Sequence, residues 1–243
     1  MKLTACALTD VGLRRSNNED SVFADINSGL FIVADGMGGH AAGEVASCMA
    51  VETICQQLPA LEAAVDPATC LQEAFICASR SIRQVAAAET IKKGMGTTLS
   101  VLYIAGDSVH LAHVGDSRIY RLRRTKLEQL SIDHSLVAEQ MRQGIISPEE
   151  ARTSQLRNIL LQAVGLEDKV DVFLLRQPLR DGDLFLLCSD GLSDMLDDEQ
   201  ICSILRQEHS VERTARALVE AAKAAGGRDN IGVVVVKNSN SED

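Results

Sequence analysis

Residues 31–36 read FIVADG, an apolar run that ends on an aspartate, Asp35, followed by a glycine. Two further runs have the same form, LAHVGDS at 111–117 and LFLLCSDG at 184–191. Short apolar runs bounded by glycine, aspartate and asparagine are typical of buried strands. The sequence therefore predicts core strands that each finish on a carboxylate.

A further acid, Asp229, lies just before the last apolar run, IGVVVV at 231–236. Carboxylates at the ends of buried strands can meet at one edge of a sheet, where they repel one another unless a cation compensates them. Hard divalent cations prefer such oxygen ligands. The pattern indicates a metal-dependent protein and favours an enzyme. The strand-end acids are Asp35, Asp116, Asp190 and Asp229.

Composition excludes several classes of function. The 243 residues are 46% hydrophobic and 24% charged, which is ordinary for a globular protein and argues against disorder. The net charge of −10 disfavours binding to nucleic acid or to an anionic membrane surface. No apolar stretch reaches the length of a membrane span, and the first residues lack a secretory signal. We therefore expect neither nucleic acid nor a membrane as a partner.

The seven cysteines are odd in number and contain no Cys-x-x-Cys pair. Four of them fall at apolar positions of expected helices. They are Cys48, Cys55, Cys70 and Cys77. We interpret the cysteines as buried, reduced thiols and expect a cytoplasmic location.

The order of the expected elements favours an α+β fold. One helix carries an apolar stripe from Val45 through Cys48 to Leu58 and stops at Pro59; another begins near Thr69, and two more precede the last strand. Alternation of strand blocks and helix pairs predicts two packed antiparallel β-sheets, a β-sandwich, flanked by helices on both outer faces. Strands are expected at 3–8, 21–25, 30–34, 97–105, 108–114, 118–123, 127–130, 170–176, 183–188 and 231–237.

No linker or repeat divides the chain, so residues 1–238 are expected to form a single domain, followed by a polar tail at 239–243. Residues 131–165 are more polar than their surroundings and contain short helical pieces, one of which starts at Ser147-Pro148. We interpret this segment as a flap-like helical insertion that shapes substrate choice.

Six short motifs occur in an order that resembles a known family. Each is weak alone, because Asp-Gly is common in turns. Together they are similar to the PPM-type, metal-dependent serine/threonine protein phosphatases (the type 2C group) in their compact bacterial form, from about Thr4 to Val236. The motifs are RSNNED (15–20), ADGMGGH (34–40), GTT (96–98), VGDSR (114–118), SDG (189–191) and DNI (229–231).

The resemblance implies two core cations, Mn²⁺ or Mg²⁺. By this resemblance Asp35 bridges both ions, Gly36 adds its carbonyl, and Asp190 and Asp229 hold one ion from the far side. A third, weaker cation is implied at Asp116 together with Asp190. From the residues alone, each of these segments could equally be a turn or a helix cap.

Glu19 and Asp20 are adjacent at the start of a strand, so their side chains point to opposite faces and should play different roles. The family places both near the metals, and direct, water-mediated and outer contacts all stay open. Arg15 is implied as the phosphate clamp, because a guanidinium fits two phosphate oxygens at once. Its neighbour Arg14 is interpreted as solvated.

His40 is a candidate general acid, because hydrolysis must protonate the departing serine or threonine oxygen. In eukaryotic relatives a histidine directly follows Asp-Gly, whereas this chain has Met37 there. A metal-bound water is the rival proton donor. Both assignments stay open.

The activity implied is hydrolysis of phosphoserine and phosphothreonine in proteins by direct attack of a metal-activated water. The expected protein is a monomer that counteracts a bacterial serine/threonine kinase. One rival function is a catalytically inactive module that binds phosphoproteins; the complete set of core ligands argues against it. Another is a metal hydrolase acting on small phosphate esters or nucleotides.

Overall fold

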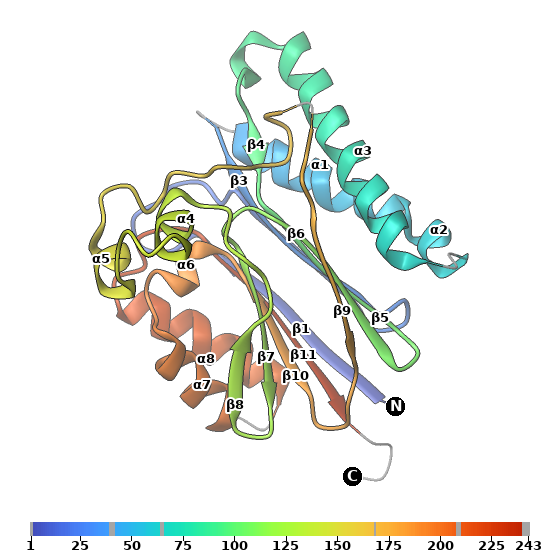
Figure 1. The fold of residues 1–243 in the computed structure, drawn as a ribbon, viewed down its shortest axis with the longest axis vertical. Helices are drawn as coiled ribbons and strands as arrows, with labels where there is room; N and C mark the ends of the chain where they lie inside the picture. Colours follow the sequence, from blue (N-terminus) through green and yellow to red (C-terminus); the bar gives the residue numbers. More distant parts are fainter. Residues whose placement is uncertain (1, 39–41, 64–65, 168, 208–209, 240–243) are drawn as a thin grey trace.

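Two antiparallel β-sheets pack face to face and carry the architecture (Figure 1). The structure is a computed structural model that describes residues 2–38, 42–63, 66–167, 169–207 and 210–239. The first sheet has the strand order β1-β11-β10-β7-β8. Its strands are β1 (Lys2–Asp10), β11 (Ile231–Ser239), β10 (Leu184–Cys188), β7 (Arg118–Arg123) and β8 (Lys126–Gln129).

The second sheet has the order β2-β3-β5-β6-β9, and the short β4 pairs with β3 at its end. Neighbouring strands in both sheets are antiparallel, and hairpins connect β2 to β3, β5 to β6 and β7 to β8. Its strands are β2 (Asp20–Asp25), β3 (Leu30–Met37), β4 (Gly96–Thr97), β5 (Leu99–Ala105), β6 (Ser108–Val114) and β9 (Phe173–Pro178).

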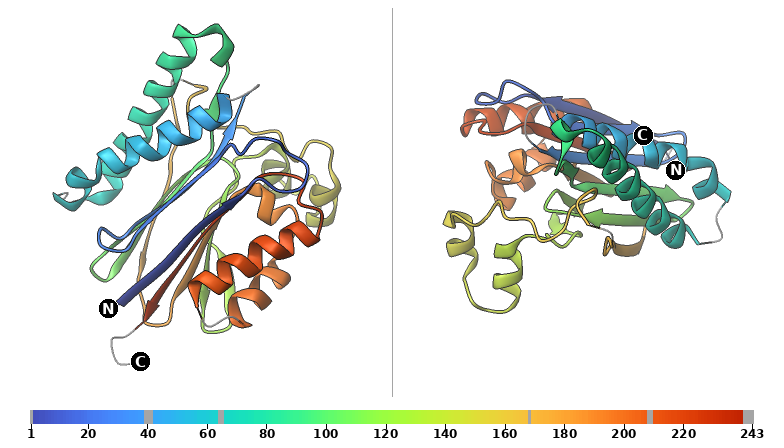
Figure 2. Two further views of the ribbon diagram at one scale, coloured as in Figure 1. Left: turned by 180° about the vertical axis from the view of Figure 1, so that it is seen from behind. Right: turned by 90° about the horizontal axis from the view of Figure 1, so that it is seen from above.

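Helices cover the outer face of each sheet (Figure 2). The second sheet carries α1 (Ala42–Gln56) and α3 (Pro67–Ala88), with α2 (Leu58–Ala63) and the 3-10 turn η1 (Thr90–Lys92) at the ends of α3. The first sheet carries α6 (Asp190–Ser193), α7 (Asp198–Gln207) and α8 (Val211–Ala224). The predicted α+β class, a sandwich of antiparallel sheets with helices on both outer faces, is confirmed.

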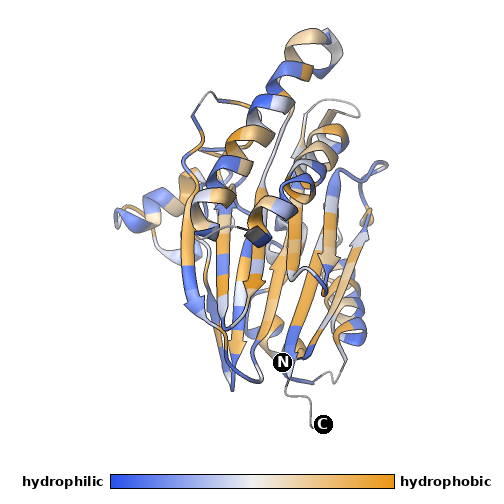
Figure 3. Cartoon of the chain, turned by 90° about the vertical axis from the view of Figure 1, so that its right-hand side faces the viewer, coloured by the Kyte–Doolittle hydropathy of each residue, from blue (hydrophilic) through white to orange (hydrophobic). Residues whose placement is uncertain are grey.

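Hydrophobic side chains form three layers. Between the sheets, Phe31, Phe185 and Val234 are fully buried. Further layers lie under α1 and α3 and under α7 and α8. Figure 3 shows the apolar residues gathered along the strands. Because aromatic residues make up only 3% of the chain, aliphatic side chains fill most of this core.

The buried face of α1 differs from the predicted one. Ala46, Ala50 and Ile54 are fully buried, whereas Cys48, which the apolar spacing had placed on the buried stripe, is exposed. Small side chains let the helix backbone lie close to the sheet, so residue size decides which face is buried here. Pro59 does not stop this helix. Pro59 lies in the first turn of α2, where the N–H that proline lacks would have no partner within the helix.

Two backbone features shape the end of the second sheet. β3 continues through Asp35 to Met37, three residues beyond the predicted end. The single strand predicted at 97–105 is interrupted at Thr98, between β4 and β5. The N–H of Thr98 donates to the carbonyl of Asp35 over 2.9 Å. The interruption therefore ties the end of β3 to the start of β5.

Residues 131–165 form the predicted helical insertion. It contains α4 (Leu136–Arg142) and α5 (Pro148–Thr153), and Ser147 begins α5 with a capping box, as its sequence predicts. The segment returns to the sheet where Val164 pairs with Thr97. We call residues 131–165 the flap.

The base of the flap is anchored by an ion pair. The guanidinium of Arg118, on β7, donates to both carboxylate oxygens of Asp133 over distances of 2.8–3.2 Å. A backbone bridge between Ser135 and Leu160 closes the two ends of the flap on each other. These contacts hold the start and the end of the flap at the end of the sandwich where the strand-end aspartates lie.

Within the described ranges, every helix is too short or too polar to cross a bilayer. All seven cysteines are free thiols. Only Cys188 is buried, and both Cys48 and Cys77 are exposed. The expectation of buried thiols is therefore wrong for most of them. The last strand reaches Ser239, two residues beyond the prediction, and residues 240–243 of the expected tail lie outside the described residues.

Candidate metal centre

The strand-end aspartates converge at one end of the sandwich. Asp35 lies near the end of β3, and Asp116 lies in the turn after β6. Asp190 is the first residue of α6, directly after β10 and Ser189, and Asp229 lies just before β11. All four line one pocket of about 230 Å³, together with Arg15, Glu19 and Gly36. The clustering that the sequence predicts is observed.

Limited access to water makes this cluster of half-buried aspartates electrostatically costly. Desolvation raises the pKa of Asp190 to about 6, and repulsion by Asp194 and Asp229 adds to the effect. Desolvation also raises the pKa of Asp35 and Asp116 well above the usual range, and each of them is further repelled by Asp190. No arginine or lysine ion pair balances Asp35, Asp116 or Asp190 among the described residues. The cluster therefore favours a bound positive charge.

Asp20 lies behind the pocket and faces Asp35 across β2 and β3. The hydroxyl of Ser189 donates to its Oδ2 over 2.7 Å, while its buried Oδ1 has no hydrogen-bond partner. Burial raises the pKa of Asp20 to about 7. Glu19 instead lines the pocket. The two adjacent acids thus occupy different environments.

Glycines bring backbones into contact beside the acids. A Cβ on Gly36 would lie 2.0 Å from the carbonyl oxygen of Gly43, at the start of α1. A Cβ on Gly191 would lie 1.8 Å from the carbonyl oxygen of Asn230. Any side chain at either position would push these segments apart. The Asp-Gly pairs are therefore required by chain packing as well as by access to an ion.

Arg15 is held at the pocket by Asp229. Its Nη2 donates to Asp229 Oδ2 over 2.7 Å, and the guanidinium is about half exposed. This hydrogen bond, together with the charge of Asp229, raises the pKa of Arg15. A guanidinium has five N–H donors, so one contact leaves donors for a second anion.

Two site residues escape the sequence prediction. Asn230 is buried, and its side chain donates to the carbonyls of Val11 and Asn17 and accepts from the N–H of Glu19. It therefore fastens the Asp229 turn to the segment that carries Arg15. Ser189 links Asp20 to Gly232, whose N–H donates to the serine hydroxyl over 2.8 Å. Both residues belong to the SDG and DNI motifs. The sequence of a turn does not show, however, that its polar side chains bond to residues far away in the chain.

His40 lies outside the described residues, so its role stays a prediction. Met37, which replaces the histidine of eukaryotic relatives, lines the pocket. His113 is fully buried, and burial lowers its pKa to about 3. It is therefore neutral at working pH and serves a structural role.

The residues present fit hard divalent cations. The pocket offers carboxylate oxygens, and the unpartnered Oδ1 of Asp20 marks a buried negative group with unmet hydrogen-bonding capacity. Within the described part of the chain, no three His, Cys, Asp or Glu side chains form a ready-made ligand set. A hard cation bound in this pocket would complete its ligand shell with water and with the backbone carbonyl of Gly36.

Known proteins resemble the chain along nearly its whole length. The family model described as protein phosphatase 2C matches residues 14–226. The serine/threonine phosphatase stp of Listeria welshimeri is 41% identical over 95% of this chain and 94% of its own. Protein phosphatase PhpP of Streptococcus pneumoniae is 38% identical over 97% of each chain.

Solved structures show the same arrangement. The Mycobacterium tuberculosis serine/threonine phosphatase PstP/Ppp has a TM-score of 0.92 at 39% identity, covering 98% of this chain and 99% of its own. The catalytic domain of PstP in complex with two manganese ions has a TM-score of 0.90, at the same identity and coverage.

We predict that the chelator-treated protein is less stable at about pH 8 than at about pH 5. Asp20 and Asp190 titrate at about 7 and about 6 in the folded state, against 3.8 when unfolded. Between these values the folded state binds more protons, so the free energy of unfolding falls as pH rises. Thermal melts in chelator across this window measure the trend.

The Asp20→Asn variant is the control, because it removes one of the titrating groups without changing its shape. Its melting temperature should depend less on pH than that of the wild type. A wild-type protein that gains stability between about pH 5 and 8, or a variant with an unchanged trend, would contradict the prediction.

Proposed function

The chain belongs to the protein phosphatase 2C family, and on that premise we propose that it hydrolyses phosphoserine and phosphothreonine in proteins with the help of divalent cations. This agrees with the PPM-type resemblance in the sequence. The observation that carries the proposal is the convergence of Asp35, Asp190 and Asp229 in one pocket beside Arg15.

Four residues would hold the two core cations, Mn²⁺ or Mg²⁺. Asp35 supplies a carboxylate from β3 and Gly36 its backbone carbonyl, while Asp190 and Asp229 approach from the first sheet. Asp116, which lines the same pocket, is our candidate for a third, weaker cation together with Asp190. Glu19 would act on the cations from the lining of the pocket, and Asp20 would act from behind the pocket.

Cations at this site supply a water whose pKa lies near neutrality and positive charge close to the phosphate. Arg15 binds and orients the phosphate through guanidinium donors that Asp229 leaves free. Its raised pKa keeps it charged at any working pH. Asn230 keeps the Arg15 segment against the Asp229 turn. We retain His40 as the candidate proton donor to the departing oxygen.

Retention of all four core positions opposes the first rival, an inactive phosphoprotein-binding module. Such a module needs no cluster of closely spaced carboxylates, because in the absence of a cation their repulsion raises the free energy of the folded state. The second rival, a hydrolase of small phosphate esters, is opposed by the size of the adjoining cleft. This cleft has a volume of about 460 Å³ and shares Asp116 and Asp190 with the metal pocket.

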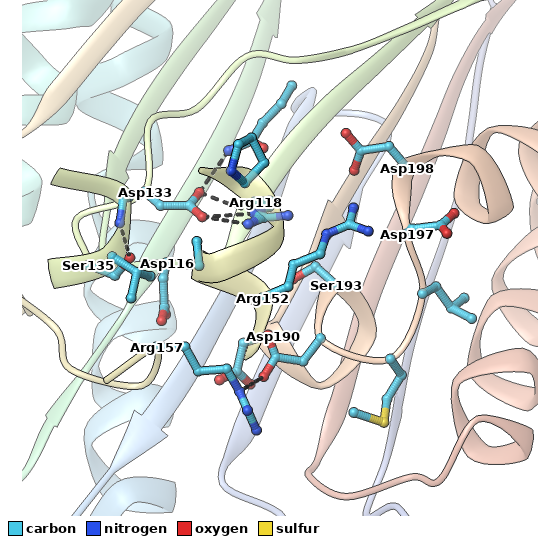
Figure 4. A pocket seen from close by; sticks show the side chains of 18 of the residues that line it. Asp116, Arg118, Asp133, Ser135, Arg152, Arg157, Asp190, Ser193, Asp197 and Asp198 are labelled. Atoms are coloured by element: carbon cyan, nitrogen blue, oxygen red, sulfur yellow. Dashed lines mark hydrogen bonds and ion pairs between the residues drawn. The ribbon is translucent and has the colours of Figure 1, made fainter. Parts of the chain in front are cut away.

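We propose that this adjoining cleft, between the flap and the α6–α7 segment, receives the polypeptide next to the phosphorylated residue (Figure 4). Its back wall is fixed, because Arg118 is paired with Asp133. Arg157 of the flap donates to Asp194 over 3.1 Å at the side of the cleft. Arg152 also lines it and forms no ion pair with another described residue, so it remains available to an anionic substrate.

We further propose that residues 1–238 act as one catalytic domain, as a monomer, on the substrates of a cognate serine/threonine kinase. The proposed centre is complete within one chain, so it needs no residue from a partner subunit. A cytoplasmic location is supported by the seven free cysteines, since disulfides are rare in reducing compartments.

We predict that Asp190→Asn abolishes activity but stabilises the metal-free protein. Losing a direct ligand should lower Mn²⁺-dependent hydrolysis of para-nitrophenyl phosphate by at least about 100-fold, since even outer contacts of metal ligands cost 10–100-fold. Removing one of several closely spaced charges that repel one another should raise the melting temperature in chelator.

The matched control is Asp181→Asn, which changes an exposed aspartate outside the pocket and should alter neither value. Wild-type turnover that persists with all divalent ions chelated would contradict metal dependence. An Asp190→Asn variant with full Mn²⁺-dependent activity would contradict the assigned ligand.

The cleft makes a separate prediction. Arg152→Glu should lower kcat/KM for a phosphothreonine peptide by about fivefold or more. This factor corresponds to the loss of one exposed charge contact worth about 1 kcal/mol. Hydrolysis of para-nitrophenyl phosphate should not change, because this ester is too small to reach the cleft. The control is Arg206→Glu at the exposed end of α7. Equal losses with both substrates would refute a role in peptide recognition.

A further inference from the structure

Thr98 lies directly behind Asp35, at the interruption between β4 and β5. Its side chain is almost fully buried, with a relative exposure of 2%. The N–H of Asp35 donates to Thr98 Oγ1 over 2.9 Å, and the N–H of Thr98 donates to the Asp35 carbonyl over the same distance. Thr98 therefore contacts both backbone polar groups of Asp35, and the hydroxyl of Thr97 also donates to the Asp35 carbonyl over 2.9 Å.

The same hydroxyl also reaches the turn that carries Asp116. Thr98 Oγ1 lies 2.7 Å from the hydroxyl oxygen of Ser117, which is fully buried. Gly115, in the same turn, has a φ of +109°, and a Cβ there would lie 2.6 Å from the Cβ and methyl carbon of Thr98. Thr98 therefore contacts this turn through its hydroxyl and through its methyl group.

Other contacts hold the rest of this turn in place. The ring Nε2 of His113 lies 3.0 Å from the carbonyl oxygen of Gly115, and the N–H of Gly115 donates to Nδ1 of His134. These contacts anchor Gly115 to β6 and to the flap, but they do not touch Asp35. The pair of hydroxyls on Thr98 and Ser117 is what connects the turn to the end of β3.

We propose that the Thr98 and Ser117 hydroxyls are positioning groups that set the separation of the Asp35 and Asp116 carboxylates, and through it the affinity for divalent cations. The inference rests on the proposed function. Neither hydroxyl is assigned as a ligand; each acts through the aspartate beside it. Groups that orient metal ligands in this way change metal affinity by about 10–100-fold when they are removed.

Thr98 offers two opposite substitutions. Thr98→Val keeps the methyl group against Gly115 but removes the hydroxyl, leaving the Asp35 N–H and the Ser117 hydroxyl without their partner. Thr98→Ser keeps the hydroxyl and removes the methyl. Isothermal titration of each folded protein with Mn²⁺ measures binding without any substrate. We expect about 10-fold weaker binding or more for Thr98→Val, and near wild-type affinity for Thr98→Ser.

Ser117→Ala provides a second test that does not depend on the folding of Thr98→Val, because it leaves the bond between Asp35 and Thr98 intact. It should weaken Mn²⁺ binding in the same direction. The double variant should lose less than the product of the two single losses, since both remove one shared contact.

Thr214→Val is the control for loss of a buried threonine hydroxyl. Thr214 lies in α8 and is 1% exposed, and its hydroxyl donates to the carbonyl of Ser210, the residue that caps the start of this helix. It should lower the melting temperature without changing Mn²⁺ affinity. If Thr98→Val and Ser117→Ala behave in the same way as this control, the positioning role is overturned. A wild-type protein that binds no Mn²⁺ would instead overturn the proposed function, and the inference with it.

Discussion

Mutual repulsion among closely spaced carboxylates, of which Asp20 is buried and the others are half-buried, governs this molecule. Asp20, Asp35, Asp116 and Asp190 all have a raised pKa, because burial and neighbouring acids disfavour their charged forms. A sandwich selected for stability alone would place apolar residues at these strand ends. The cluster makes physical sense when a cation neutralises it, and that requirement links the fold to its chemistry.

The surrounding structure holds these like charges together. The absence of side chains at Gly36 and Gly191 lets the acid-bearing segments touch α1 and the Asn230 turn. Arg15 balances Asp229 from the solvent side. The contacts of Gly191 and of Arg15 join segments far apart in the sequence, so the geometry of the site depends on the packing of distant parts of the chain.

Much of this arrangement could be predicted from local patterns. Apolar runs that end on aspartate identify both the core strands and the strand-end acids. The spacing of apolar residues on α8 identifies the buried face of this helix. Both features depend only on residues close together in the sequence. The buried face of α1 could not be predicted from hydrophobicity, because most of the residues on it are alanines, whose small size lets the helix lie close to the sheet. Asn230, Ser189 and Thr98 owe their importance to partners across the fold, which no local pattern contains.

The most direct measurement of the central claim is an anomalous difference map from a crystal grown with Mn²⁺. We predict two strong peaks between the two sheets, with the carboxylate of Asp35 contacting both ions and those of Asp190 and Asp229 contacting one. Peaks elsewhere, or none in this pocket at saturating Mn²⁺, would contradict the account.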